Sequence, residues 1–149
     1  MSEPSTIHAS AVLIGAKAVL IRGPSGAGKS ALAWELLEAG RAGMLPFARL
    51  VADDRALIEA RHGGLLVRPA AALAGLIEIR GLGIRRLAHE PLAVVGLVID
   101  LAASDADRLP ARETLETTIE GVTLPRLAVA PGAPALPALL AWLGTAAGD

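Results

Sequence analysis

The sequence feature that most constrains the fold is the octapeptide GPSGAGKS at residues 23–30. It matches the pattern G-x-x-x-x-G-K-[ST], in which a glycine-rich loop joins a strand to a helix and surrounds phosphate groups. The apolar residues 18–21 precede the loop, and a segment with leucines at helical spacing follows it. The motif therefore has the strand–loop–helix context that it requires, and this context favours the α/β class.

Each part of this loop has a role in phosphate binding. Glycines allow positive φ and let backbone N–H groups turn inward, while the helix N-terminus adds a favourable dipole. We predict that Lys29 reaches the β- and γ-phosphates and that the Ser30 hydroxyl binds Mg²⁺, so ATP and Mg²⁺ are the expected cofactors. The alternative is a glycine-rich turn that matches the pattern by chance. The predicted nucleotide-binding residues are Gly23, Pro24, Ser25, Gly26, Ala27, Gly28, Lys29 and Ser30.

The remaining pattern predicts one mixed α/β domain over residues 1–149. Paired apolar runs around short polar turns indicate two β-hairpins, so a purely parallel sheet is not expected. No repeat or linker-like segment divides the chain. The predicted hairpins cover 11–22 and 56–68, the helices 29 to about 39 and 135–146, a short helical turn 70–73, further strands 49–52, 76–80, 92–101 and 122–129, and a helix is an option within 105–120.

Composition excludes several classes of protein. The chain has 15 acidic and 14 basic residues and a net charge of -1, so we expect neither nucleic acid nor an anionic membrane as partner. Cysteine is absent and the N-terminus does not resemble a signal peptide, so a cytoplasmic location is expected. The uncharged residues 127–148 carry three prolines within seven residues, which favours a strand, a loop and a terminal helix over a membrane span.

Asp53 and Asp54 are the first candidates for catalysis. They follow the apolar strand predicted at 49–52. In proteins with this kind of phosphate loop, a later strand commonly ends in a carboxylate that binds the metal ion. Neighbouring side chains at a strand end point in different directions, so one carboxylate can face the metal while the other faces the acceptor. The alternative is a pair of exposed acids in a turn.

His8 and Glu78 are further candidates, each with a simpler alternative. If the first hairpin turns at residues 15–17, His8 lies opposite residues 23–25 of the phosphate loop, although it could equally be a surface histidine. Glu78 and Arg80 share one face of a predicted strand, where the carboxylate could complete a Mg²⁺ shell and the arginine could meet phosphate. An ion pair at a strand edge is the alternative.

Five segments together resemble a known family. IHAS, GPSGAGKS, RLVADD, LIEIRGLGI and ASDADRLP occur in the order and approximate spacing of the catalytic domain of HPr kinase/phosphorylase, over residues 7–110. The chain is similar to the short form that lacks the N-terminal domain. The resemblance implies a fold related to phosphoenolpyruvate carboxykinase. It also implies ATP- and Mg²⁺-dependent phosphorylation of a serine in HPr, a phosphocarrier protein of the phosphotransferase system.

The resemblance also implies a role for individual residues. Asp54 matches the proton acceptor for the serine, and Asp53 would support the metal or orient its neighbour. The family also runs a reverse reaction with inorganic phosphate, but residues 128–136 lack the arginine of the corresponding family segment, so the sequence does not predict that activity. The other implied positions are His8, Lys29 and Arg108 in the active site, and Ser30 and Glu78 as magnesium contacts.

Two other functions share the nucleotide site and stay open on the sequence alone. A small-molecule P-loop kinase would carry its own acceptor pocket. A non-catalytic nucleotide-sensing regulator would change a partner surface on binding ATP and would not need Asp54. Homo-oligomerisation also stays open, since the hexamer of full-length relatives does not follow from this shorter sequence.

Overall fold

The fold is organised around β9 (Ala93–Asp100), as the computed structural model of residues 3–148 shows. One edge of β9 pairs in parallel with β3 (Lys17–Arg22). Its other edge pairs with two strands in turn. The first is β6 (Gly64–Pro69), antiparallel at Ala93 and Val94, and the second is β11 (Val122–Ala128), parallel from Val98 to Asp100. The sheet therefore forks at β9.

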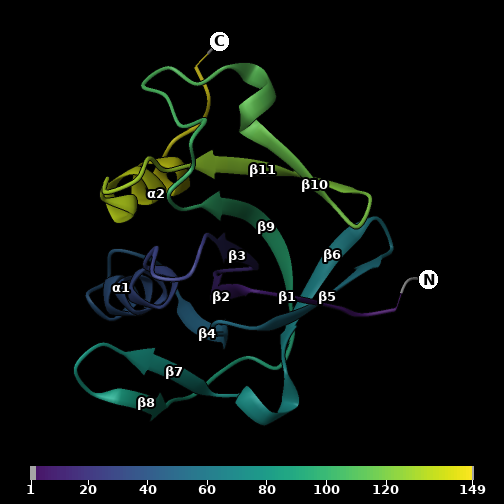
Figure 1. Ribbon diagram of the computed structural model, residues 1–149, viewed down its shortest axis with the longest axis vertical. Helices are drawn as coiled ribbons and strands as arrows, with labels where there is room; N and C mark the ends of the chain where they lie inside the picture. The colour runs from purple at the N-terminus through teal and green to yellow at the C-terminus, as the bar shows by residue number, and fades with distance from the viewer. Residues whose placement is uncertain (1–2, 149) are drawn as a thin grey trace.

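The other strands extend the two branches into one mixed, nine-stranded sheet. Beyond β3 lie β2 (Ala9–Ile14) and β4 (Ala48–Ala52), both antiparallel to their neighbours. Beyond β6 lie β5 (Ala56–Arg61) and β1 (Ser5–Ile7), and β10 (Glu116–Ile119) forms a hairpin with β11. The sheet curls, as Figure 1 shows, and the predicted α/β fold with a mixed sheet that includes hairpins is confirmed.

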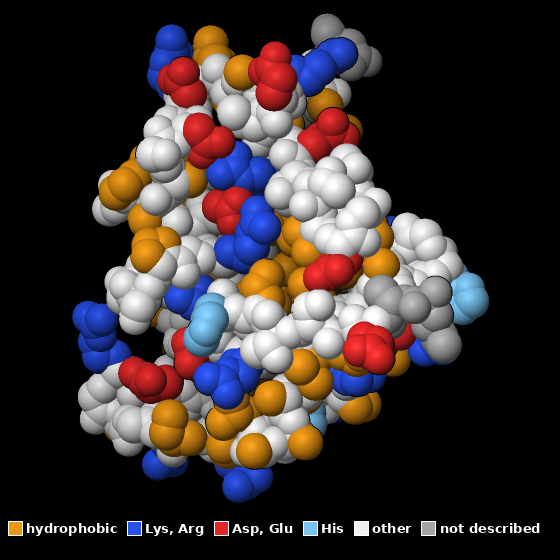
Figure 2. Space-filling model, turned by 45° about the vertical axis from the view of Figure 1, so that its right-hand side comes forward, with side chains coloured by type: hydrophobic (Ala, Val, Ile, Leu, Met, Phe, Trp, Pro, Cys, Tyr) orange, Lys and Arg blue, Asp and Glu red, His pale blue; other side chains and the backbone are white. Residues whose placement is uncertain are grey.

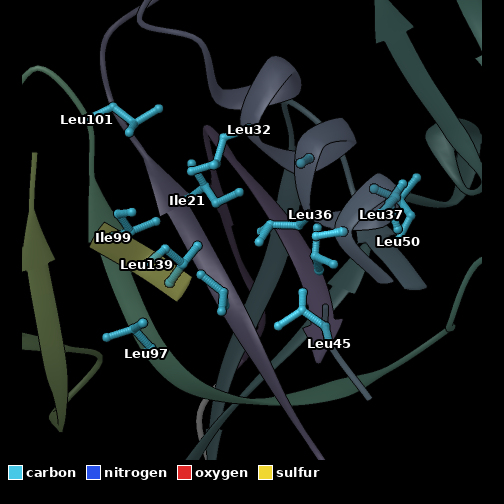
Figure 3. Packing of buried hydrophobic residues seen from close by; sticks show 14 of the residues in the cluster. Ile21, Leu32, Leu36, Leu37, Leu45, Leu50, Leu97, Ile99, Leu101 and Leu139 are labelled. Atoms are coloured by element: carbon cyan, nitrogen blue, oxygen red, sulfur yellow. The ribbon is translucent and has the colours of Figure 1, made fainter. Parts of the chain in front are cut away.

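Two helices cover one face of the sheet, α1 (Lys29–Arg41) and α2 (Ala135–Gly144). Alternation along β3 sends Val19 and Ile21 toward the helices, whereas Ala18 and Leu20 face a second apolar cluster enclosed by the curled β5–β6 branch. The predicted leucine face of α1 is confirmed. The buried side chains around it in Figure 3 include Ile21, Leu32, Leu36, Leu37, Leu50, Leu97, Ile99 and Leu139.

A small second sheet stands beside α1. It consists of β7 (Leu76–Ile79) and β8 (Gly83–Arg86), at the lower left of Figure 1. Ile77 is buried in the main core and anchors the hairpin, while Leu82 and Ile84 are largely exposed. The hairpin thus forms a wall opposite α1, and this wall bounds the candidate site described below.

The structure corrects the sequence analysis in the C-terminal third. A helix within residues 105–120 is wrong except for the short 3₁₀ turn η2 (Arg112–Leu115). The segment Glu-Thr-Thr-Ile that follows forms β10 because β-branched residues favour strands, and Glu120 and Gly121 take the positive φ values, 50° and 78°, of a tight hairpin turn. Strands β1 and β8 were not predicted, whereas the short helical turn at 70–73 is confirmed as η1 (Ala71–Leu73).

The surface shows no broad field of one charge on the face drawn in Figure 2. Acidic and basic side chains are interspersed there, in keeping with the net charge of -1. None of the helices described in the structure is long and apolar enough to span a membrane.

Candidate active site

The glycine-rich loop connects β3 to α1 and ends at the N-terminus of the helix. The Ala27 N–H donates to the Pro24 carbonyl at 3.0 Å, which closes a tight turn. Gly28 caps α1 with a φ of 101°, a conformation that favours glycine, and no side chain bonds to the N–H groups of the first turn. These N–H groups are therefore available to an anion.

Lys29 lies within the curve of this loop. Its side chain is only 8% exposed, and its Nζ donates to the carbonyl oxygens of Gly23 at 2.8 Å and Pro24 at 3.2 Å. These bonds hold the ammonium against the first two residues of the loop. The N-terminus of α1 adds positive potential to the same loop. Together these groups form a compact cationic site of the kind that binds terminal phosphates.

Gly23 is required for close packing at the base of the loop. A Cβ at this position would lie 3.1 Å from the Leu101 Cβ and 3.2 Å from the Ala27 Cβ. We expect Gly23→Ala to lower the free energy of unfolding by about 1–3 kcal/mol, as overpacking usually does. Urea unfolding measures this effect. Gly144→Ala is the matched control because a Cβ there meets no atom within 4 Å, and an equal loss in both variants would contradict the packing argument.

Asp53 connects three elements around the loop. Its side chain is buried at the end of β4, where its carboxylate accepts the Ser30 hydroxyl from α1 at 2.7 and 2.8 Å. The Ser10 hydroxyl of β2 donates to Oδ1 at 2.7 Å, and the Glu78 N–H of β7 donates to Oδ2 at 3.0 Å. The carboxylate therefore fixes the phosphate loop, the central sheet and the β7–β8 wall relative to one another.

Asp54 is exposed and lies in an unusual turn. Its φ is +65°, and the Arg55 N–H donates to the Asp53 carbonyl at 2.7 Å across it. A three-residue turn with positive φ at its centre is rare and strained. Here it separates the two carboxylates: that of Asp53 is buried against Ser30, while Asp54 lines an open cavity.

This cavity has a volume of about 430 Å³ and lies between α1 and β7. Its lining combines the polar side chains of Lys29, Ser30, Asp54 and Glu78 with the apolar surface of Trp34 and Ile79. The cavity therefore leaves room beside the phosphate loop for a group that would accept a phosphate. The lining residues are Ser25, Gly26, Gly28, Lys29, Ser30, Ala31, Trp34, Glu35, Asp54, Glu78, Ile79 and Arg80.

Several predicted site residues lie outside the lining of this cavity: the buried Asp53, the loop residues Gly23, Pro24 and Ala27, and the more distant candidates His8 and Arg108. The β2–β3 register runs from Ala9 opposite Arg22 to Ile14 opposite Lys17, so His8 and Gly23 each lie one residue beyond its last pair, and His8 forms the bend between β1 and β2. The side chain of His8 is exposed. Arg108 is also exposed, on the loop from β9 to η2 that runs along the top of Figure 1, whereas β7 and β8 lie at the bottom.

An ion network that the sequence analysis missed secures the carboxyl ends of β3, β9 and β11. Arg22 donates to both oxygens of Asp100, at 2.7 and 2.8 Å, and Arg126 donates to Asp100 at 2.6 Å. Arg126 also binds Asp105 through two hydrogen bonds, at 2.8 and 2.9 Å. Arg22 immediately precedes the phosphate loop, so the network fixes the start of that loop. Charged residues at three strand ends were visible in the sequence, but their pairing depends on the strand order.

The network lowers the pKa of both carboxyl groups. Burial by itself raises the pKa of Asp100, but hydrogen bonds and charge from Arg22 and Arg126 outweigh burial and leave it below the ordinary 3.8. The hydrogen bonds from Arg126 likewise hold the pKa of Asp105 below its ordinary value. Both groups therefore favour their ionised form in the folded protein.

This shift predicts a pH dependence of stability. The folded pKa of Asp105 lies below its unfolded value of 3.8, so its contribution is complete above that pH and is lost as the pH falls through the folded pKa. We expect Asp105→Asn to be less stable than the wild type at pH 7, with a difference that shrinks below about pH 4. Urea unfolding at several pH values tests this. Glu113→Gln is the exposed control, and a difference independent of pH for Asp105→Asn would contradict the prediction.

The groups beside Ser30 fit a magnesium ion, although they do not form a complete ligand cage. Within residues 3–148, no three His, Cys, Asp or Glu side chains gather as a metal site. Mg²⁺, however, commonly takes one or two protein oxygens and completes its shell with water and substrate phosphates. The Ser30 hydroxyl, oriented by Asp53, and the Glu78 carboxylate at the cavity match that chemistry.

The fold and the loop define a mixed α/β domain with a candidate phosphate-binding loop, and comparison with known proteins gives its family. The family model described as HPr Serine kinase C-terminal domain matches residues 1–133, and the chain belongs to that family. It is 36% identical over 141 residues to HPr kinase/phosphorylase from Limosilactobacillus reuteri, and 44% identical over 85 residues to that from Streptococcus thermophilus.

A solved structure agrees with this family. The Hpr(Ser) kinase/phosphatase from Coxiella burnetii superimposes with a TM-score of 0.71 and 27% sequence identity, covering 91% of each chain. The curated relatives are longer: the match spans 87% of this chain but 42% of the Limosilactobacillus protein, and 56% of this chain but 25% of the Streptococcus protein. The chain therefore corresponds to less than half of the length of these relatives.

Proposed function

We propose that residues 1–149 form one catalytic domain, an ATP- and Mg²⁺-dependent protein serine kinase that acts on an HPr-type phosphocarrier protein. The observation that carries this proposal is the hydrogen-bonded pair of Ser30 and Asp53, with Asp54 beside it at the cavity. Phosphoryl transfer needs a phosphate cradle, a metal-supporting carboxylate and a group that handles the acceptor hydroxyl. The family of the chain supports the same assignment.

The phosphate loop would bind and orient the nucleotide. Backbone N–H groups at the start of α1 and the Lys29 ammonium face the place where the β- and γ-phosphates would lie. The Lys29 ammonium, which now donates to the Gly23 and Pro24 carbonyls, would turn a hydrogen toward the phosphates on binding. When bound, Mg²⁺ would neutralise developing charge on the phosphates, with Ser30 and Glu78 as its protein contacts and Asp53 orienting Ser30.

Asp54 would act on the acceptor serine. In this reaction the serine oxygen forms a bond to the γ-phosphorus while the bond from that phosphorus to the bridging oxygen breaks, and ADP leaves with the electron pair. The Asp54 carboxylate would accept the serine proton as the new bond forms. Asp54 is exposed at the cavity, so a loop of a protein substrate could reach it. A kinase for small molecules would not need its proton acceptor to be open to a protein.

The proposal is tested by incubating the chain with HPr, Mg²⁺ and ATP labelled at the γ-phosphate. We expect label on a serine of HPr, and none when Mg²⁺ is removed with a chelator. Label on a metabolite but on no protein would indicate a small-molecule kinase. Nucleotide binding without any transfer would indicate a regulator instead.

The reverse reaction is tested in the same system with phosphoserine-HPr and inorganic phosphate. Because residues 128–136 contain no arginine, we expect this activity to be much weaker than the forward reaction. A cytoplasmic location stays a prediction, as does the role of His8 and Arg108.

A further inference from the structure

We propose that Ser10 is a positioning residue for phosphoryl transfer, because its hydroxyl holds the turn that presents Asp54 to the acceptor. The expected effect on turnover rests on the proposed function. The claim that Ser10 holds the turn at Asp54 can be tested by a measurement that does not depend on enzymatic activity. The Ser10 hydroxyl bonds to Asp53 and to the Asp54 backbone rather than to the phosphate loop. It would act through Asp53 and Asp54.

The Ser10 hydroxyl is fixed by two hydrogen bonds. Its side chain is completely buried in β2, its Oγ donates to Asp53 Oδ1 at 2.7 Å, and the same Oγ accepts the Asp54 N–H at 3.2 Å. A serine hydroxyl has one hydrogen to donate and lone pairs to accept. One atom therefore fixes both the carboxylate of Asp53 and the backbone of Asp54.

The strand register explains why these residues meet. In the antiparallel β2–β4 pair, Ala11 lies opposite Ala52, so the next step along both strands brings Ser10 opposite Asp53. A register shift between Ala11 and Val12 then changes the pairing of the rest of β4. The neighbours Ala9, Ala11 and Ala52 are small and buried, which lets the two backbones and the hydroxyl come together.

The turn at Asp54 needs such support. A non-glycine residue at a φ of +65° in a three-residue turn is strained, and such conformations persist only where surrounding groups hold them. The bond from the Asp54 N–H to Ser10 Oγ joins this turn to strand β2. Without it, the Asp54 backbone would be free to relax toward a more common conformation, and its carboxylate would move relative to the phosphate loop.

Ser10→Ala tests the inference by separating turnover from nucleotide binding. We expect kcat to fall by about 10- to 100-fold, because a displacement of roughly 1 Å in a catalytic group costs on this order. The dissociation constant for ATP should change less than about twofold, because the Ser10 hydroxyl bonds to Asp53 and Asp54, while Ser30 keeps its own bonds to both oxygens of Asp53. Ser104→Ala, at an exposed serine beyond β9, is the control and should behave as the wild type.

A double variant distinguishes positioning from a general loss of stability. If Ser10 acts through Asp54, adding Ser10→Ala to Asp54→Asn should lower kcat little further, whereas independent effects would multiply. Should Ser10→Ala fold poorly, Ser10→Cys fills the site with a slightly larger side chain that makes a much weaker hydrogen bond, and it should show the same loss of kcat. Wild-type kcat in a folded Ser10→Ala or Ser10→Cys protein would overturn the inference, and so would multiplicative effects in the double variant.

Amide hydrogen exchange tests the structural part without reference to activity. The Asp54 amide of the wild type should exchange slowly for an exposed residue, and Ser10→Ala should accelerate it at least about tenfold while the amides of β3 keep their rates. Unchanged exchange at Asp54 would overturn the inference. If the wild type phosphorylated no protein, the proposed function would fail, yet this measurement would still decide whether Ser10 holds the turn.

Discussion

Asp54→Asn is expected to reduce kcat for serine phosphorylation by roughly 10²–10⁴-fold, the usual contribution of a positioned general base. Asparagine keeps the size of the side chain but cannot accept the serine proton. The dissociation constant for ATP should stay within about twofold, because Asp54 makes none of the hydrogen bonds that hold Lys29. Initial rates with HPr, together with nucleotide binding by calorimetry, measure both quantities.

Glu113→Gln is the matched control for this variant. Glu113 is an exposed acid on η2, so its neutralisation changes the net charge equally without touching the cavity. Wild-type turnover in Asp54→Asn would exclude Asp54 as proton acceptor. Equal losses in both variants would instead point to a long-range effect of charge.

Lys29→Met should abolish productive nucleotide binding. We expect kcat/KM to fall roughly 10²–10³-fold, comparable to the loss of a preorganised donor at a developing negative charge. Methionine fills part of the buried space, but the ammonium that bonds the Gly23 and Pro24 carbonyls is lost. Lys29→Arg should not rescue activity, because the planar guanidinium is larger and does not replace a compact ammonium within the loop.

The protein offers an internal control for this second experiment. Lys17 is the only other lysine in the sequence, and it is exposed at the start of β3. Lys17→Met retains the aliphatic stem that packs beside Gly96, so it should keep wild-type kinetics. If Lys17→Met lost as much activity as Lys29→Met, the special role of Lys29 would be refuted.

Local signals in the sequence were enough to predict the parts of the fold that depend on neighbouring residues. The loop motif, the leucines of α1 and the register of the β2–β3 hairpin all follow from contacts within about thirty residues, so pattern and spacing indicated them. Strand β10 was missed because its polar composition resembled a helix or loop. Its conformation depends on the turn at Glu120 and Gly121 and on pairing with β11.

The parts of the site that stayed hidden depend on the order of strands. Asp53 and Asp54 were predicted from their place after β4, but the bond from Ser10 requires that β2 lie beside β4. Likewise, Arg22, Asp100 and Arg126 come together only because β9 lies between β3 and β11. No local pattern specifies these pairings, since a strand alone carries little information about its neighbours.

The central position of β9 also has a consequence for biosynthesis. The phosphate loop follows β3, and one edge of β3 is completed only by β9, more than seventy residues later in the chain. A growing polypeptide would therefore have made the whole nucleotide-binding motif long before it could hold that motif in shape. Pairing between such distant segments is slow compared with hairpin closure, so the loop should acquire its form late, after β9 has left the ribosome.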